Sequence, residues 1–305
     1  RVSKCAERTR HMEIIAKAEH LSHVYPGGIK ALSDVSLTLY RQDITAVIGQ
    51  NGSGKTTLSK HFNGLLKATE GNVLVKDQNV SKKKVSEMAK DVGYVFQNPS
   101  YQLFCSNVRD EIKFGLKNLK LNKKDTVLKT NEVMKRFHLT RYAKNQPMTL
   151  GSGMKKIVAL AGVYAMNPSL LILDEPTTGQ DQPGKSSLGE LMREMSMQGK
   201  SILVISHDMN FVSEYAKRVI VMANGKIIKT GTPDQIFTDE RIMNKAHIQP
   251  PQVYAIANYL RKNGMIIQNS EINADHLAQL ISERSVAVDG CYDTLQTGKL
   301  VFSQM

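Results

Sequence analysis

A glycine-rich segment that contains a lysine and a threonine has the composition and spacing of a phosphate-binding loop. Residues 49–56 have the sequence GQNGSGKT, which matches GxxxxGK[ST], and they lie between the apolar run Ile44–Ile48 and a helical pattern over 57–66. The glycines let backbone N–H groups turn towards phosphates, Lys55 reaches the β and γ phosphates, and the Thr56 hydroxyl ligates Mg²⁺. The segment is therefore predicted to bind ATP and Mg²⁺. The predicted cofactor contacts are Asn51, Gly52, Ser53, Gly54, Lys55, Thr56 and Thr57.

Two carboxylates follow a second apolar run. Residues 170–173 are continuously apolar, as in a buried parallel strand, and the run ends in Asp174 and Glu175. Ligands of open α/β sheets bind at the carboxyl ends of strands, so Asp174 is predicted to hold Mg²⁺ through its waters and Glu175 to accept a proton from the attacking water. Alone, such a pair is more often a solvated strand end. Together with the phosphate loop, it favours a hydrolytic site.

Two further polar residues occupy comparable positions. His207 follows the apolar run 202–205, so it is predicted to contact the γ-phosphate or the attacking water, although a lone histidine is usually structural. Gln97 follows the run 92–96, where the chain leaves the core, and is predicted to sense Mg²⁺ and to transmit motion. The candidate catalytic residues are Glu175, His207 and Gln97, and the candidate metal-binding residues are Thr56, Gln97 and Asp174.

The elements that must position these residues alternate between strand and helix patterns. Short runs of β-branched and apolar residues are followed by longer helical patterns from residue 13 onwards. This alternation predicts an α/β fold with a largely parallel central sheet. The predicted strands are 44–48, 73–75, 170–173, 202–205 and 219–222.

Two other segments depart from this alternation. Charged, helix-forming residues over about 98–154 predict a helical insertion, with helices at 108–116 and 124–137. Beyond residue 237, two prolines open a further helix pattern. Its apolar residues, at i, i+3, i+4 and i+7 spacing, are Val253, Ile256, Ala257 and Leu260. The predicted organisation is an extension or tag over 1–12, a main domain over 13–237 and a small C-terminal appendage over 238–305.

Composition excludes some classes of protein and leaves others open. The chain has 305 residues, 41% of them hydrophobic, which suits a globular fold. No apolar run approaches the length of about 18 residues that a membrane-spanning helix needs. Three scattered cysteines, Cys5, Cys105 and Cys291, favour a reducing cytosol. The net charge of +13 permits an anionic partner such as nucleic acid, but the lysines are dispersed and no nucleic-acid motif accompanies them, so none is expected.

These motifs, in this order, closely resemble those of the ATPase subunits of ABC transporters, over residues 13 to about 263. The resemblance implies a P-loop ABC ATPase fold and assigns the adenine-stacking aromatic to Tyr25, in the segment HVYPGGIKALSDVSL. The alternative is a core or surface tyrosine. The resemblance also makes Gln97 the Q-loop residue, Asp174 the Walker B aspartate, Glu175 the catalytic glutamate, 178–181 the D-loop and His207 the switch histidine.

Three segments resemble the energy-coupling-factor class of importers more specifically. They are HFNGLLKATEGNVLV at 61–75, VFQNPSYQLFCSNVRDEIKFGLKNL at 95–119 and HIQPPQVYAIANYL at 247–260, the last of which resembles an extension that helps two ATPase subunits associate. This resemblance implies ATP-powered uptake of a vitamin or a transition-metal ion. It also implies three partners: a second ABC ATPase subunit, identical or related, a transmembrane coupling protein and a substrate-capturing membrane protein. The chain would lie on the cytoplasmic face of the cell membrane.

The family signature LSGGQ is altered in this chain. Its place is taken by Leu150, Gly151, Ser152, Gly153 and Met154, in which serine and glycine are exchanged and glutamine is absent. The family signature acts in trans, on the nucleotide of the other subunit. In a helix, Ser152 would point about 100° away from the expected direction, so the site completed by this signature is predicted to be weakened. A partner with an intact signature would complete this chain's own site. In the D-loop, Gln180 stands where leucine is usual.

Two alternatives to an importer remain open at this point. The first is a non-transport ABC ATPase that acts on nucleic acid or the ribosome, although the chain has one phosphate loop and no heptad array. The second is a weakly hydrolysing regulatory subunit, which the altered signature permits. Intact Lys55, Glu175 and His207 argue against a wholly inactive subunit.

Overall fold

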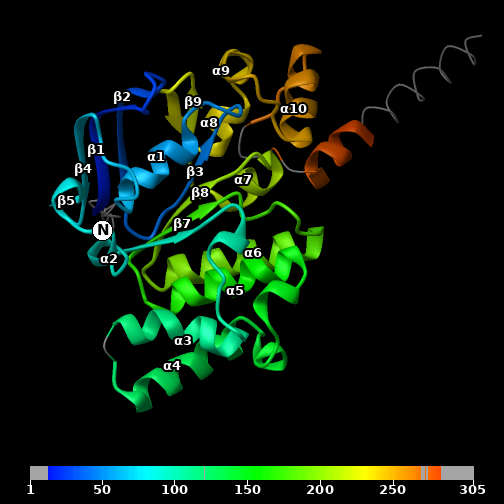
Figure 1. The fold of residues 1–305 in the computed structure, drawn as a ribbon. Helices are drawn as coiled ribbons and strands as arrows, with labels where there is room; N and C mark the ends of the chain where they lie inside the picture. The colour runs from blue at the N-terminus through cyan, green and yellow to red at the C-terminus, as the bar shows by residue number, and fades with distance from the viewer. Residues whose placement is uncertain (1–12, 120, 269–271, 273, 283–305) are drawn as a thin grey trace, which may run out of the picture.

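The computed structural model describes residues 13–119, 121–268, 272 and 274–282, and its centre is a six-stranded sheet (Figure 1). The strand order is β10-β9-β3-β8-β7-β6, with every pair parallel except β9 and β10. The strands are β3 Ile44–Ile48, β6 Val92–Val95, β7 Leu170–Asp174, β8 Ser201–Ile205, β9 Arg218–Ala223 and β10 Lys226–Gly231. The predicted α/β class with a mostly parallel sheet is confirmed.

A second, antiparallel sheet covers one face of the first. Its order is β2-β1-β4-β5, from β1 Ile14–Val24, β2 Lys30–Tyr40, β4 Glu70–Val75 and β5 Gln78–Asn79. The strand predicted over 73–75 is present within β4, but it pairs with β1 and β5 and so belongs to this second sheet. A strand's pairing partner depends on contacts distant in sequence, which local pattern does not encode.

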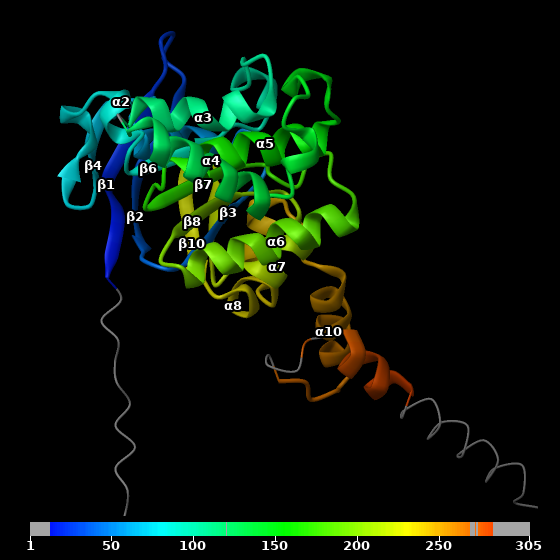
Figure 2. The same cartoon turned by 90° about the horizontal axis from the view of Figure 1, so that it is seen from below.

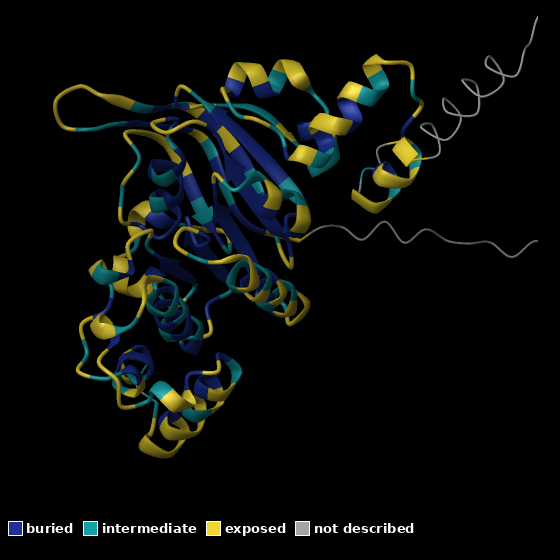
Figure 3. Cartoon of the chain, turned by 90° about the vertical axis from the view of Figure 1, so that its right-hand side faces the viewer, coloured by how far each residue is buried: buried dark blue, intermediate teal, exposed yellow. Residues whose placement is uncertain are grey.

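Helix α1 (Lys55–Phe62) lies between the two sheets. Leu58 and Phe62 are fully buried in the core that the sheets share, together with Val47 of β3. Ile44, Ala46 and Ile48 of the same strand face the opposite core, as the alternation of side chains along a strand requires. The sequence predicts this helix over 57–66, whereas α1 spans 55–62. The helix begins two residues earlier and ends four residues earlier than predicted. Figure 3 shows the resulting buried layers.

The other face of the central sheet is covered by helices. α5 (Ser152–Ala165), α6 (Gln182–Met197), α7 (Met209–Tyr215) and α8 (Pro233–Phe237) all contribute to its core. α6 begins at a defined point because the carboxylate of Asp181 accepts a hydrogen bond from the Gly184 amide, which caps the helix. The short α2 (Val85–Met88) lies beside the antiparallel sheet.

The expected helical region lies beside α5. α3 (Val108–Asn118) and α4 (Lys123–Arg136) match the two helices predicted there to within two residues at each end. Each starts at an asparagine, Asn107 or Asn122, whose side chain accepts a hydrogen bond from the third helical residue. Figure 1 shows α3 and α4 at one end of the molecule, away from the antiparallel sheet.

The C-terminal part consists of α9 (Glu240–Ala246), α10 (Gln252–Lys262) and a helix over 274–282 (Figure 2). In α10, Ala257 is buried but Ile256 is 42% exposed, so the predicted apolar stripe is only partly covered. The expected extension over 1–12 and the last part of the appendage, 283–305, lie outside the described residues. Among the described residues, no helix has the length and apolar character needed to cross a membrane.

Candidate nucleotide-binding site

The loop over residues 49–54 joins β3 to α1, and its shape requires glycine. Gly49 and Gly54 have φ angles of 150° and 100°. A Cβ atom on Gly49 would lie 2.2 Å from the carbonyl oxygen of Met222, and one on Gly54 would lie 2.7 Å from that of Ala31. A side chain at either position would therefore displace the backbone of a neighbouring segment. The predicted phosphate loop has the tight fold that backbone binding of phosphate needs.

The Lys55 ammonium is held within this loop. Its Nζ atom donates hydrogen bonds to the carbonyl oxygens of Gly49, at 2.8 Å, and Gln50, at 3.0 Å. Burial lowers the pKa of Lys55, and the nearby carboxylates of Glu175 and Asp174 act in the opposite direction. The loop therefore presents a partly desolvated cation, which suits the binding of phosphate oxygens.

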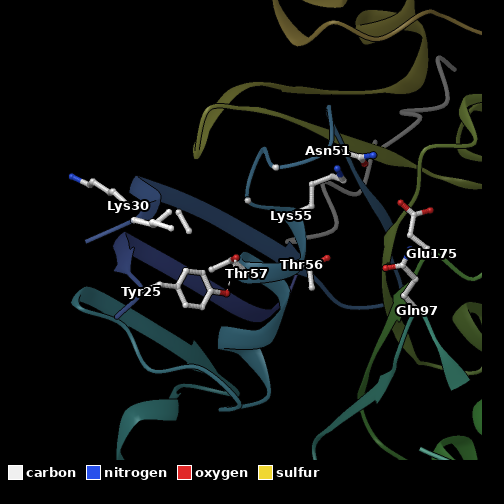
Figure 4. A pocket seen from close by; sticks show the side chains of 12 residues that line it. Tyr25, Lys30, Asn51, Lys55, Thr56, Thr57, Gln97 and Glu175 are labelled. Carbon is white, nitrogen blue, oxygen red and sulfur yellow. Dashed lines mark hydrogen bonds between the residues drawn. The ribbon is translucent and has the colours of Figure 1, made fainter. Parts of the chain in front are cut away.

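A cavity of about 340 Å³ opens in front of the loop. Figure 4 shows Tyr25 on one side of it and Gln97 and Glu175 on the other, with Lys55 and Thr56 between them. The lining residues are Tyr25, Ile29, Lys30, Ala31, Asn51, Gly52, Gly54, Lys55, Thr56, Thr57, Gln97 and Glu175. A ligand with phosphates at Lys55 and an aromatic base towards Tyr25 would fit this layout.

The predicted residues are not all at the cavity wall. Ser53 is buried, and its Oγ atom has no hydrogen-bond partner. Asp174 and His207 do not line the cavity: Asp174 contacts Thr56, and His207 contacts Glu175. The reverse also holds: residues 29–31 line the cavity but were not predicted. They come four to six positions after Tyr25 in the sequence, and this closeness to a predicted adenine contact could have identified them as lining residues.

Thr56 and Asp174 form an oxygen-donor pair that suits Mg²⁺. The Thr56 hydroxyl lies 3.4 Å from Oδ1 of Asp174, a carboxylate that is only 3% exposed. Burial raises the pKa of Asp174, so the buried charge needs a cation. Mg²⁺ binds in proteins through one or two such oxygens and keeps several waters. The donor set therefore fits the ion.

Two residues that the sequence analysis missed orient Asp174. The Tyr94 hydroxyl donates a hydrogen bond of 3.0 Å to Oδ2 of Asp174 and lies 3.0 Å from Oγ of Ser59. Tyr94 comes from β6 and Ser59 from α1, so both the neighbouring strand and the phosphate-loop helix fix the position of this carboxylate. Burial raises the pKa of Tyr94, and the phenol stays protonated as a donor.

Glu175 faces both the cavity and His207. Its Oε2 atom lies 2.6 Å from Nδ1 of His207 and 3.3 Å from the backbone amide of the same residue. The Glu175 amide donates to the carbonyl oxygen of Ile205, which anchors the residue to β8. A carboxylate that is oriented in this way and lines the cavity can accept a proton from a water molecule.

The altered signature lies away from this cavity. α5 begins at Ser152, while Gly151 caps the helix in an extended conformation. The predicted 100° difference in side-chain direction assumed that both residues are helical. It does not apply, because Gly151 lies outside α5. The Ser152 hydroxyl instead lies 3.4 Å from the carbonyl oxygen of Gly179, and Nε2 of the Gln180 side chain donates a hydrogen bond of 3.2 Å to the carbonyl oxygen of Gly153. The signature and D-loop of the same chain thus contact each other.

Two buried histidines, His23 and His61, form a row of contacts with Tyr25, and His61 belongs to the phosphate-loop helix. His61 Nδ1 lies 2.7 Å from the carbonyl oxygen of Thr57, and its Nε2 lies 3.2 Å from Nδ1 of His23. The rings of His23 and Tyr25 meet edge to face at 4.7 Å, and the Tyr25 hydroxyl reaches Oγ1 of Thr57 at 3.1 Å. This arrangement connects the tyrosine to the phosphate-loop helix.

Acidification is expected to destabilise the protein through His61. Burial lowers its pKa from 6.5 to about 4. Between these pH values the unfolded chain binds a proton that the folded chain excludes, so the free energy of unfolding falls as the pH drops, by roughly 3 kcal/mol in total. Thermal unfolding as a function of pH should show a steeper loss of stability between pH 6.5 and 4 in the wild type than in His61→Asn. The variant His20→Asn, which changes an exposed histidine, should keep the slope. Equal slopes in all three proteins would contradict the assignment.

Comparisons with known proteins agree with this geometry. The family model described as ABC transporter matches residues 32–178. The chain is 37% identical over 254 residues to the energy-coupling factor transporter ATP-binding protein EcfA of Methanocaldococcus jannaschii, covering 83% of this chain and 91% of that protein. It is 36% identical over 256 residues to a putative ABC transporter ATP-binding protein of Caldanaerobacter subterraneus, covering 84% of this chain but only 45% of that longer relative.

A solved structure is similar to this chain in both fold and sequence. The cbiO1 protein from Clostridium perfringens, described as part of the ABC transporter complex cbiONQ, superposes with a TM-score of 0.70. It is 34% identical in sequence, and the match covers 80% of this chain and 99% of that one. Likeness in both sequence and fold therefore covers about four fifths of this chain.

Proposed function

The chain belongs to the ATP-binding proteins of ABC transporters, and we propose that Lys55, Asp174 and Glu175 carry its hydrolysis of MgATP. It is the ATP-binding subunit of an importer of the energy-coupling-factor type and hydrolyses ATP to drive transport. One observation carries the residue assignment: a single cavity brings together the phosphate loop, Gln97 and Glu175.

In the proposed mechanism, the phosphate loop and Lys55 bind the phosphates while Tyr25 covers the adenine ring. Thr56 and Asp174, together with Gln97 from the lining of the cavity, would hold Mg²⁺, which neutralises charge on the phosphates when bound. Glu175 accepts a proton from the water that attacks the γ-phosphate. His207, at 2.6 Å from the Glu175 carboxylate, keeps that carboxylate oriented.

An apolar groove between α3 and α5 supports a membrane partner. The groove has a volume of about 180 Å³ and includes Phe104, Phe114 and Met166 in its lining. Phe104 is 64% exposed and packs edge to face on Phe114, while nearby Tyr101 is 82% exposed. Exposed aromatic side chains beside an apolar groove are typical of an interaction site. We assign this groove to a helical segment of a transmembrane coupling protein, on the cytoplasmic face of the cell membrane.

The other proposed partners follow from the same family. Exposed Ile256 and Tyr259 on α10 support association of the C-terminal appendage with a second ATPase subunit. A substrate-capturing membrane protein would supply the cargo, which we propose is a vitamin or a transition-metal ion. The altered signature favours pairing with a sister ATPase whose own signature is intact.

A mild-detergent pull-down from native membranes, read by mass spectrometry, tests this function. We expect multi-span membrane proteins and a second ATPase to co-purify with the chain. The double variant Phe104→Asp/Phe114→Asp should lose the membrane proteins and still bind ATP. The control Val127→Asp/Leu128→Asp, which changes exposed apolar residues on α4, should keep them. Recovery of ribosomes or nucleic acid without membrane proteins would contradict the proposal.

A further inference from the structure

A buried lysine joins the signature helix to the proposed catalytic glutamate. Lys156 lies in the second turn of α5, is 6% exposed, and its Nζ atom donates a hydrogen bond to the carbonyl oxygen of Glu175. Burial lowers the pKa of Lys156 to about 8, and the carboxylates of Glu175 and Asp174 act in the opposite direction. Buried lysines are rare unless they are paired, so this side chain has a specific partner rather than a solvated position.

The backbone that Lys156 contacts is in an unfavourable conformation. Glu175 has a φ angle of 50°, in the left-handed region, which residues other than glycine rarely adopt. Such a conformation persists only where surrounding contacts hold it, and it is frequent at functional sites. The Glu175 amide is bonded to β8 through Ile205, and its carbonyl oxygen is bonded to Lys156. Both peptide groups of the glutamate are therefore fixed by tertiary contacts.

Two further contacts connect helix α5 with the loop that follows β7. The first turn of α5 contacts the loop 175–180 at Ser152 with Gly179 and at Gly153 with Gln180. The Gln180 side chain lies close over Gly153, where an added Cβ would come within 2.6 Å of its oxygen. The signature segment, the D-loop and the backbone of Glu175 thus form one connected unit, with Lys156 as its contact nearest to the catalytic residue.

We propose that Lys156 is a positioning residue, which holds the Glu175 backbone in its left-handed conformation and couples the orientation of that glutamate to the signature helix α5. The inference rests on the proposed role of Glu175 as the proton acceptor. Lys156 itself is not among the residues that line the cavity. A displacement of α5 would therefore change the position of Glu175 within the same chain.

The test is ATP turnover by the full chain, in the purified transporter complex, with Lys156→Met and Lys156→Arg. We expect Lys156→Met to reduce kcat by roughly 10–100-fold, as a misplaced catalytic group does, while KM and the Kd for ATP stay unchanged. Lys156→Arg keeps a charged donor and should retain more activity than Lys156→Met. Nucleotide recovered from the Lys156→Met complex after incubation should be mainly ATP rather than ADP.

A matched control is Lys200→Met. Lys200 is also partly buried with a lowered pKa and donates to a backbone carbonyl oxygen, that of Pro168, but at the opposite end of β7. It should leave kcat unchanged. The inference is overturned if Lys156→Met turns over ATP like the wild type, if it alters only ATP affinity, or if the arginine variant loses as much activity as the methionine variant at a temperature where both are folded.

A parallel measurement on Glu175→Gln separates this inference from the proposed function. If Glu175→Gln remains active, the role of Glu175 is wrong whatever the lysine variants do. If Glu175→Gln is inactive while Lys156→Met is fully active, only the positioning role of Lys156 fails.

Discussion

Replacing Glu175 by glutamine is expected to leave ATP binding intact and to reduce turnover by roughly 10²–10⁴-fold, the contribution of a positioned general base. The amide has nearly the same shape as the carboxylate, and its oxygen can still accept the hydrogen bonds that His207 donates to Oε2. The amide cannot accept a proton from the attacking water. The variant should therefore lose the chemical step and keep the geometry of the site.

Release of inorganic phosphate and equilibrium binding of ATP, measured on the same preparation, distinguish these two effects. Glu190→Gln is a suitable control, because Glu190 is exposed on α6 and pairs with Arg193 outside the site. It should match the wild type in both measurements. Turnover by Glu175→Gln close to that of the wild type would remove Glu175 from the catalytic role. Loss of ATP binding would instead show that the Glu175 carboxylate contributes to binding of ATP and not only to the chemical step.

The parts of the site that the sequence predicts are those with local causes. The phosphate loop needs glycines at fixed spacing because its backbone turns sharply, and the apolar run before Asp174 marks a buried strand end. Parallel strands bring their carboxyl ends to one edge of a sheet, so Asp174, Glu175 and His207 were expected to be neighbours. The structure places Thr56 and Asp174, and Glu175 and His207, within contact of each other.

The parts that the sequence does not predict depend on packing between distant segments. Tyr94 orients Asp174 across 80 positions of the chain, and nothing near Tyr94 marks it as different from another strand tyrosine. In the sequence, Lys156 cannot be distinguished from any other helical lysine. Its contact with Glu175 depends on the packing of α5 against the loop after β7. The strand at 73–75 is a strand as expected, but its pairing with β1 is set by the tertiary fold. Local pattern predicts the type of an element better than its partners.

Restoring the family signature is expected to raise ATP turnover by roughly 10-fold or more, since hydrogen-bond donors aimed at developing charge have effects of this size or larger. The variant is Gly151→Ser/Ser152→Gly/Met154→Gln. The structure accommodates it: a Cβ on Gly151 meets no atom within 4 Å, and this residue occupies the helix-cap position that serine favours. Ser152→Gly also removes the contact between the Ser152 hydroxyl and Gly179, which ties the signature to its own D-loop.

Single variants separate these two contributions. If the missing serine at the helix cap limits turnover, Gly151→Ser alone should provide most of the gain. If the contact with Gly179 limits turnover, Ser152→Gly alone should provide it. Unchanged turnover of the triple variant in the reconstituted complex, with an unchanged unfolding temperature, would show that the altered signature is not limiting.

The site at which the gain appears then distinguishes action in trans from action within the chain. In a complex with a sister ATPase, a signature that acts in trans raises hydrolysis of the nucleotide bound to the sister subunit. Adding Glu175→Gln to the triple variant should in that case abolish turnover at this chain's own site and preserve the gain at the other. A signature that acts through Gly179 and Gln180 on its own chain would lose the gain completely, because the only Glu175 it can influence has been removed.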